Sequence, residues 1–389
     1  MIDMKKKSHK KPIKKHDKRG LSNEPYKGLD KLLYFLSLVI ILSGIAMAFT
    51  LFDLSFIADF FKKQETTISQ SIGTIDNVTT TDEIVEVCEK TLALTGECIE
   101  PDELQYAPLV AVMIENHVDA RPQSGLVDAS IVYEVPVEAN YSRFLALYPI
   151  TTDVPKIGPV RSSRPYFLDW MFEYGKPLYL HVGGSNAALE KIKTNGVVSV
   201  NEMTKSWFFW RSKDRYAPHN TYTSSKLWNQ AYKKYIEDVE YESYSPWKFS
   251  NNVPPCQQDC VSNIDVTFLS PDYTVNWKYN KSIEQYQRYQ GRSNTLHVDQ
   301  DGRLISADTI IVQHVTSQVL DNVGRLSIDT IDSGNAEVYQ NGHKISGTWK
   351  KETAKGRTRW YDQNGDQIPL NAGKIWIEVV NQRGSVESS

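Results

Sequence analysis

The feature that most constrains this chain is an uncharged apolar stretch near its start. Residues 32–52, LLYFLSLVIILSGIAMAFTLF, carry no charged side chain over 21 positions. As a helix rising about 1.5 Å per residue, they would cross roughly 30 Å of hydrocarbon. A buried helix and a cleaved signal peptide are the alternatives, but the first would show a polar face and the second would end at small residues. We therefore predict an uncleaved transmembrane helix at residues 32–53.

The charge distribution predicts the orientation of this helix. Residues 1–31 hold 11 Lys or Arg against 4 acidic residues, which leaves 33 basic against 43 acidic side chains in the remainder. A basic cluster before a membrane span favours a cytoplasmic N-terminus and an extracytoplasmic body. The basic tail is either solvated and disordered or held at the anionic lipid surface. The acidic body argues against nucleic-acid binding.

The cysteines agree with an extracytoplasmic body. The chain has four, Cys88, Cys98, Cys256 and Cys260, which form two close pairs in sequence. In an oxidising compartment an even number of paired cysteines predicts two disulfides, 88–98 and 256–260. A zinc site is the alternative, but the second pair lacks the usual spacing and no histidine pair follows it. We expect no metal and no cofactor.

Between the predicted span and residue 104 the composition is polar and typical of a stalk. Within this stalk, residues 84–100 are predicted to form a short helix closed by the first disulfide. The first domain is predicted at residues 105–243, because apolar strand candidates alternate there with helix candidates. Its strand candidates are 109–114, 130–137, 143–148 and 178–182, and its helix candidates are 164–174, 186–194 and 224–238. This alternation predicts an α/β sandwich with a mixed sheet.

The second domain is predicted at residues 244–381, followed by a tail at 382–389. Its strand candidates are 264–269, 274–279, 309–315, 325–331, 336–339 and 374–380. The dipeptide Asn341-Gly342 is typical of a two-residue hairpin turn and predicts a hairpin over residues 337–349. We therefore expect a β-rich sandwich or open barrel, and an α+β or α/β class for the whole body.

Four polar runs mark the first domain as the site-bearing one. They occupy residues 114–122, 133–143, 158–165 and 214–220, each at the end of an apolar stretch. Sites are commonly built where rigid strands meet loops that reach solvent.

Three of these side chains are candidates for acid–base catalysis. Glu115 or Glu134 could act as acid or base on a glycosidic or peptide link, with His219 assisting. Glu134 and Glu138 also share one strand parity, which would let them converge. The alternative is structural, in that the carboxylates neutralise nearby arginines, as fork-shaped guanidinium groups often require.

The turn at residues 161–164 is the best candidate for ligand binding. Pro165 fits the first turn of a helix, so backbone N–H groups and two hydroxyls could hold a phosphate or carboxylate there. The alternative is that the arginines tie this helix to Glu134 or Glu138. The full set of predicted ligand-binding residues is His117, Arg121, Glu138, Arg143, Arg161, Ser162, Ser163, Arg164, Arg215 and Asn220.

Other site types have weaker support in the sequence. A metal site from Glu115, His117, His181 and His219 would lack the His-x3-His spacing of a helical site, so we predict none. His181 ends an apolar strand and fits a core histidine. Phosphate-loop and nucleophile-elbow patterns are absent, so the sequence does not decide whether the protein is an enzyme. The aromatic run at 207–210 predicts core packing or, if exposed, sugar stacking or contact with the membrane surface.

Several long motifs resemble the bacterial YerB-like family, a two-part domain family without an assigned reaction. They are VAVMIENHVDARPQSGLVDASIVYEVPVEA, IGPVRSSRPYFLDWMFEYG, YLHVGGSNAAL, DRYAPHNTYTS, TIIVQHV, DNVGRLSIDTIDSGNAEVYQNGHKISGTWKK and WIEVV. The resemblance covers residues 105–381 and implies a surface-exposed envelope protein, often a lipoprotein. This chain departs from it in having a predicted membrane helix where a lipobox cysteine would stand, and in the Cys256–Cys260 segment.

Two functional hypotheses follow. The first is a single-pass envelope protein that binds an anionic wall component, such as peptidoglycan or an anionic polymer, through its clustered arginines. The second is a hydrolase or transferase acting on peptidoglycan or a related glycan. The second requires acid, base and arginines to converge on an open cleft, and it weakens if Glu115, Glu134 and His219 prove buried and fully paired.

Overall fold

The computed structural model of the chain describes residues 88–237, 243–250 and 253–389. The predicted basic tail at 1–31, the membrane span at 32–53 and most of the stalk lie outside these ranges. None of the helices within them combines the length and the apolar character that a membrane span needs.

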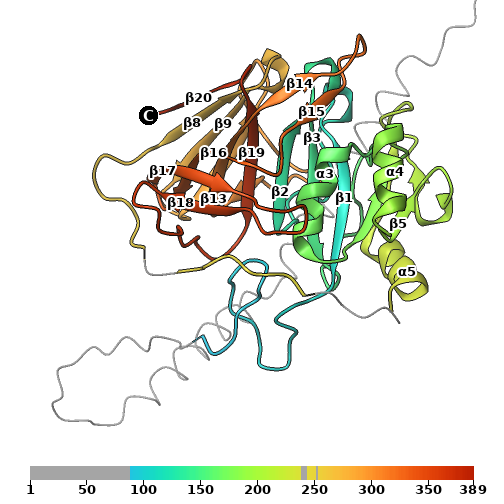
Figure 1. Ribbon diagram of the computed structural model, residues 1–389, viewed down its shortest axis with the longest axis horizontal. Coiled ribbons are helices and arrows are strands. Elements are labelled where there is room, and N and C mark those ends of the chain that lie inside the picture. The colour runs from blue at the N-terminus through green and yellow to red at the C-terminus, as the bar shows by residue number, and fades with distance from the viewer. Residues whose placement is uncertain (1–87, 238–242, 251–252) are drawn as a thin grey trace, which may run out of the picture. The chain divides into compact units, whose positions relative to one another are not determined.

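The main element is a mixed sheet of ten strands (Figure 1). Its strand order is β18-β17-β16-β13-β19-β2-β3-β1-β4-β5. The strands are β1 Leu109–Glu115, β2 Ile131–Pro136, β3 Ser142–Pro149, β4 Leu178–His181, β5 Ser199–Asn201, β13 Thr309–Val315, β16 Ser333–Gln340, β17 His343–Lys350, β18 Arg359–Asp362 and β19 Ile375–Asn381. The pairs β1–β4, β4–β5, β2–β19 and β13–β19 are parallel, and the others are antiparallel.

A second sheet of six strands is built from the C-terminal half of the chain. It contains β8 Asn263–Thr267, β9 Val275–Asn280, β10 Gln285–Gln290, β11 Thr295–Leu296, β12 Ser306–Ala307 and β20 Ser385–Ser388. Two small hairpins complete the strands: β6 Trp210–Arg211 with β7 Thr221–Tyr222, and β14 Ser317–Val319 with β15 Leu326–Ile328. Apolar side chains of the second sheet, such as Ile264 and Trp277, share one core with Val110 of β1 and Trp376 of β19. The two sheets therefore pack face to face.

Three α-helices complete the body: α3 Pro165–Met171, α4 Asn186–Thr194 and α5 Ser225–Tyr235. Short 3-10 turns also lie at Val118–Ala120, Glu138–Asn140, Phe172–Tyr174, Ser206–Phe208 and Pro271–Tyr273. Side chains of α3 share a core with alternate residues of β1 to β3, whereas α5 packs with the opposite set. The part of the sheet around β1 to β3 is thus covered on both faces, which explains why all seven residues of β1 are buried.

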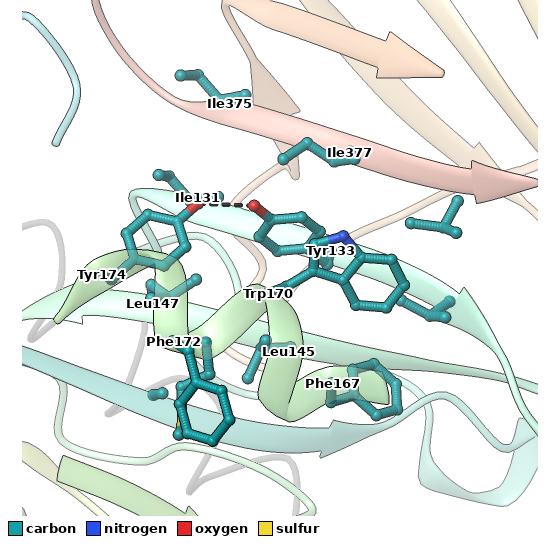
Figure 2. Close-up of a cluster of buried hydrophobic side chains, with 14 of the residues drawn as sticks. Ile131, Tyr133, Leu145, Leu147, Phe167, Trp170, Phe172, Tyr174, Ile375 and Ile377 are labelled. Atoms are coloured by element: carbon teal, nitrogen blue, oxygen red, sulfur yellow. Dashed lines mark hydrogen bonds between the residues drawn. The ribbon is translucent and has the colours of Figure 1, made fainter. Parts of the chain in front are cut away.

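Aromatic side chains fill the core beneath α3 (Figure 2). Trp170 of α3 stacks on Tyr133 of β2 with ring centroids 5.6 Å apart. The hydroxyls of Tyr133 and Tyr174 share a hydrogen bond of 2.8 Å, which satisfies two polar atoms in an apolar setting.

The sequence predictions for the body are largely confirmed. An α/β part is followed by a β-rich part, the three predicted helices are present, and the Asn341-Gly342 turn joins β16 to β17. Both predicted disulfides form. The predicted helix at 84–100 is wrong for residues 88–100, which the structure describes. They form a turn in which Thr91 and Cys98 make an antiparallel bridge.

The two halves are more closely joined than two separate domains would be. Parallel pairing of β19 with β2 makes one sheet run through both halves. The predicted domain boundary between residues 243 and 244 stays a prediction.

Candidate functional site

The end of β1 carries a partly exposed group of charged and imidazole side chains. We call Glu115, His117, Asp119, Arg161 and His219 the open cluster. At its base, the Glu115 carboxylate is largely buried and accepts a 2.8 Å hydrogen bond from Nε of Arg161 on one oxygen. Its other oxygen lies 3.0 Å from Nδ1 of His219. Glu115 therefore holds two side chains that come from loops distant in sequence.

The two histidines of the open cluster lie against each other. Their rings stack with centroids 4.5 Å apart and an interplanar angle of 18°. Oδ2 of Asp119 lies 3.5 Å from Nδ1 of His117 and 4.0 Å from Nε2 of His219. The side chains of His117 and His219 are 21% and 17% exposed, and that of Asp119 is 69% exposed, so the cluster faces solvent.

A second, more structural group lies beside the open cluster. Arg164 forms a two-pronged ion pair with Glu138, and Arg143 lies 3.7 Å from the same carboxylate. Burial alone would raise the pKa of Glu138, but the hydrogen bond from Arg164 and the charge of Arg143 lower it below its usual range. Burial and the like charge of Arg164 lower the pKa of Arg143 to about 10.

This second group accounts for the turn at 161–164. Arg164 stands at the N-cap position of α3, with Pro165 in the first turn. Its third contact is the Ser163 carbonyl, while the buried Ser163 hydroxyl accepts a 2.7 Å bond from Tyr179. The Ser162 carbonyl accepts from Arg143. These groups are thus engaged within the protein, and the tie between α3 and Glu138 matches the structural alternative of the sequence analysis.

The loop that carries His219 is held at both ends. It joins β6 to β7, and Arg215 fastens it to the body by donating to the carbonyls of Ala120 and Pro122. The Asn220 amide closes the loop on itself through the carbonyls of Ser212 and Arg215. Arg215 and Asn220 therefore position His219, and their hydrogen-bonding groups are largely engaged within the protein.

Glu134 lies elsewhere, between the two sheets and wholly buried. We call Glu134, Asn116, Ser142, Arg288 and Glu378 the interior network. Asn116 and Ser142 donate to one Glu134 oxygen, and Arg288 pairs with the other. Glu134 and Glu138 have different partners, and the Glu134 carboxylate is wholly buried and engaged on both oxygens. These contacts favour the structural alternative for Glu134 over its predicted catalytic role.

The rest of the interior network shows the effects of burial. Glu378 accepts a 2.9 Å bond from the Trp277 indole, and burial together with the Glu134 carboxylate raises its pKa well above the usual range. His297 is held between Arg288 and Gln123, and burial with the Arg288 charge lowers its pKa well below the usual range. Arg121 belongs to the edge of this network, donating to Asn116 and to the Asp272 carbonyl.

The structure brings together Glu115, His117, Arg161 and His219 of the predicted site residues. It adds Asp119, which the sequence analysis passed over although its His-x-Asp spacing to His117 was visible. His181 does not contact the open cluster in the described contacts, because its ring is hydrogen-bonded to the Gly183 carbonyl and the Ser199 hydroxyl. Burial lowers the pKa of His181 to about 4. Phe208 and Phe209 are core residues, whereas Trp207 and Trp210 are exposed at 57% and 36%.

Two hollows of the described surface are lined by residues outside the open cluster. One of about 690 Å³ is lined by residues of β13 and β16 to β18, including His314, Glu337 and Asp362. Another, of about 450 Å³, is lined by Arg121, Asp272 and residues around β11.

Comparison with known proteins places the chain in a family. The N-terminal domain model described as "Protein of unknown function (DUF3048)" matches residues 94–240, and the corresponding C-terminal model matches residues 264–377. The chain belongs to the DUF3048 family.

The comparison with protein sequences and the comparison with solved structures both match a Bacillus subtilis protein named YerB. A protein of strain 168 named "Putative lipoprotein YerB" is 29% identical over 291 residues, covering 74% of this chain and 85% of that protein. A crystal structure of YerB from Bacillus subtilis superposes with a TM-score of 0.64 at 26% identity, covering 76% of this chain and 99% of that one. The resemblance to the YerB-like family is confirmed.

Proposed function

We propose that this DUF3048 protein is a membrane-attached protein of the cell envelope with an extracytoplasmic body. The apolar stretch at residues 32–53 would anchor it with the basic tail inside, and the two disulfides fit an oxidising compartment. The relative named as a lipoprotein supports membrane attachment in the family. Alkaline carbonate extraction of membranes tests this: the chain is expected in the pellet, and its release would contradict the anchor.

We further propose that the open cluster binds an anionic component of the cell wall. The observation that carries this is Arg161, whose Nε is bound by Glu115 while the side chain remains 24% exposed beside the two histidine rings. Guanidinium groups held in this way recognise phosphate and carboxylate oxygens well.

The loop carrying His219 adds a surface suited to sugars. Trp210 and Tyr216 belong to the same β6–β7 segment and are 36% and 93% exposed. Aromatic faces of this kind stack on apolar sugar surfaces. A polymer that combines sugars with phosphate or carboxylate groups fits both features.

Co-sedimentation of the detergent-purified full-length protein with wall sacculi tests this proposal. Binding is expected at low salt and should weaken as salt screens the charges. Arg161→Ala removes a charge-assisted contact and is expected to weaken binding about 10- to 100-fold. Arg325→Ala is the matched control, since Arg325 also pairs with one carboxylate, Asp321, in the turn between β14 and β15. Equal binding by both variants would exclude the open cluster.

A second function is favoured by the Glu115–His219 contact. A buried carboxylate 3.0 Å from an imidazole nitrogen can orient that imidazole as a general base. Peptidoglycan hydrolysis is the reaction class that this dyad would serve. Chromatography of muropeptides after incubation with the full-length protein tests it, because new products should vanish with His219→Ala. An unchanged profile with the protein retained on sacculi favours the binding function.

A further inference from the structure

We infer that His117, Asp119 and His219 form a binding site for a divalent transition-metal ion, with Glu115 as the residue that orients His219. This inference goes beyond the wall-binding function and does not depend on it. Within the described residues, these three side chains form a group whose ligand atoms all lie within 4.8 Å of one another.

The distances suit a site that closes slightly on the metal. Zinc binds nitrogen and oxygen ligands at about 2.0–2.2 Å, which places tetrahedral ligand atoms roughly 3.4 Å apart. The Asp119 carboxylate is already 3.5 Å from one imidazole nitrogen and 4.0 Å from the other. Asp119 is the most exposed of the three, so its side chain can turn without disturbing packing.

One ring nitrogen of His219 lies against the Glu115 carboxylate. Nδ1 lies 3.0 Å from Oε2 of the buried Glu115, but the two atoms are not aligned as a hydrogen bond, and neither has a hydrogen-bond partner among the described residues. A small turn of the ring would align them, which places the proton on Nδ1 and leaves the lone pair of Nε2 directed toward Asp119. A carboxylate behind a histidine ligand is the usual second layer of a zinc site.

His117 also presents a lone pair in the same direction. Its Nδ1 accepts a 3.2 Å hydrogen bond from the backbone N–H of Asp119, so that nitrogen is not protonated in this arrangement. The metal would replace this long hydrogen bond. The stack keeps the two imidazoles adjacent, and one ring must turn out of it so that both in-plane lone pairs meet at one ion.

The ligand chemistry narrows the choice of ion. Two neutral imidazoles and one carboxylate favour Zn²⁺ or a similar transition metal over Mg²⁺ or Ca²⁺, which prefer oxygen ligands. Three protein ligands leave one position open, as in catalytic rather than structural zinc sites. One carboxylate leaves the bound ion with a net positive charge, so that open position would take water or an anionic oxygen.

Metal titration of the chelator-treated full-length protein tests the inference. Co²⁺ is the spectroscopic probe, followed by its visible absorption, and Zn²⁺ binding is followed by calorimetry. The wild type is expected to bind one ion per chain. His219→Ala and Asp119→Asn should each weaken binding at least about 100-fold, since each removes a direct ligand.

Glu115→Gln tests the orienting role separately. It keeps the shape of the side chain but loses the charge, and affinity should fall about 10- to 100-fold. His314→Ala is the matched control, because His314 also has one carboxylate neighbour, Glu337, at 3.8 Å. It should bind as the wild type does.

Absence of a Co²⁺ spectrum and of Zn²⁺ heat in the wild type would overturn the site. Binding by Asp119→Asn and His219→Ala equal to that of the wild type would do the same. Asp119→Asn changes an exposed side chain, and its circular dichroism and unfolding midpoint show whether a loss of binding reflects the ligand rather than the fold. If Glu115→Gln binds as tightly as the wild type, Glu115 has no orienting role.

Discussion

The open cluster and the interior network start from the same kind of sequence, a glutamate at the end of an apolar strand. Glu115 ends β1 and Glu134 lies near the end of β2, and β3 pairs with both strands. Alternate residues of β1 and β2 point to opposite faces of the sheet. Met113, which shares the parity of Glu115, packs in the core of α3, whereas Val132, which shares that of Glu134, packs toward the six-stranded sheet.

The difference lies in what surrounds each carboxylate. Glu134 meets an arginine, an amide and a hydroxyl inside the protein, which fixes the packing of the two sheets. Glu115 contacts one arginine and one imidazole at the surface, and these two side chains remain partly exposed to solvent. Position in the sheet, rather than residue type, separates a structural carboxylate from a functional one.

The largest expected effect comes from breaking the interior pair. Glu134→Ala leaves Arg288 buried without its carboxylate, so the free energy of unfolding should fall by about 3–5 kcal/mol. Glu115→Ala should cost less than half as much, because Arg161 can turn to solvent. Urea unfolding of the full-length protein measures both, and equal losses would contradict the division between the two regions.

Arg161 of the open cluster and Arg164 beside it should also differ in how much they stabilise the fold. Arg164 is 14% exposed and makes three contacts, so Arg164→Ala is expected to lower the free energy of unfolding by about 1.5–3 kcal/mol. Arg161→Ala, at a more exposed ion pair, should cost about 1 kcal/mol or less. Thermal melts can rank the two variants, and a reversed order would make Arg161 the structural residue.

A smaller, pH-dependent effect should arise from Glu378. Its raised pKa means that the native state holds a proton that the unfolded chain releases above the usual carboxyl pKa. Stability due to this group is therefore complete below that pKa and is lost as pH rises toward the native pKa. Glu378→Gln keeps the oxygen that accepts from Trp277 and should reduce the downward slope by up to about 1.4 kcal/mol per pH unit.

Unfolding free energies from pH 5 to 8 would show this change in slope. Glu190→Gln, at an exposed helix position, is the control and should leave the slope as it is. A slope in Glu378→Gln equal to that of the wild type would mean that Glu378 is ionised in the native state.

The smallest effect on stability is expected at His219. Its ring lies at the surface of the open cluster, so His219→Ala should change the free energy of unfolding by less than about 1 kcal/mol. A stable variant that has lost metal or wall binding would assign His219 to function. A loss of several kcal/mol would make it part of the scaffold instead.

Much of the body could be predicted from the sequence because its elements have strong patterns. The apolar run of β13 and the Asn-Gly turn after β16 needed no tertiary information. β10 was missed because its sequence, QYQRYQ, has no apolar run, yet its inward positions hold Tyr286 and the buried Arg288.

The site could be predicted only in part, for a related reason. Strand ends correctly located Glu115 and Glu134, but which face each carboxylate takes depends on strand register across residues far apart in sequence. The approach of His219 to His117, about one hundred residues earlier, likewise depends on the loop that Arg215 holds in place.

The pairing of β19 between β2 and β13 has a consequence for how the protein folds during its synthesis. This strand comes long after its neighbour β2 in the sequence, yet it pairs with β2 and fills the middle of the ten-stranded sheet. A ribosome must therefore make all of the chain from β2 to β19 before the sheet can close, and long-range pairing of this kind is slow. Chains that terminate before β19 would expose two unpaired inner edges, so they are expected to accumulate only as aggregated or degraded fragments.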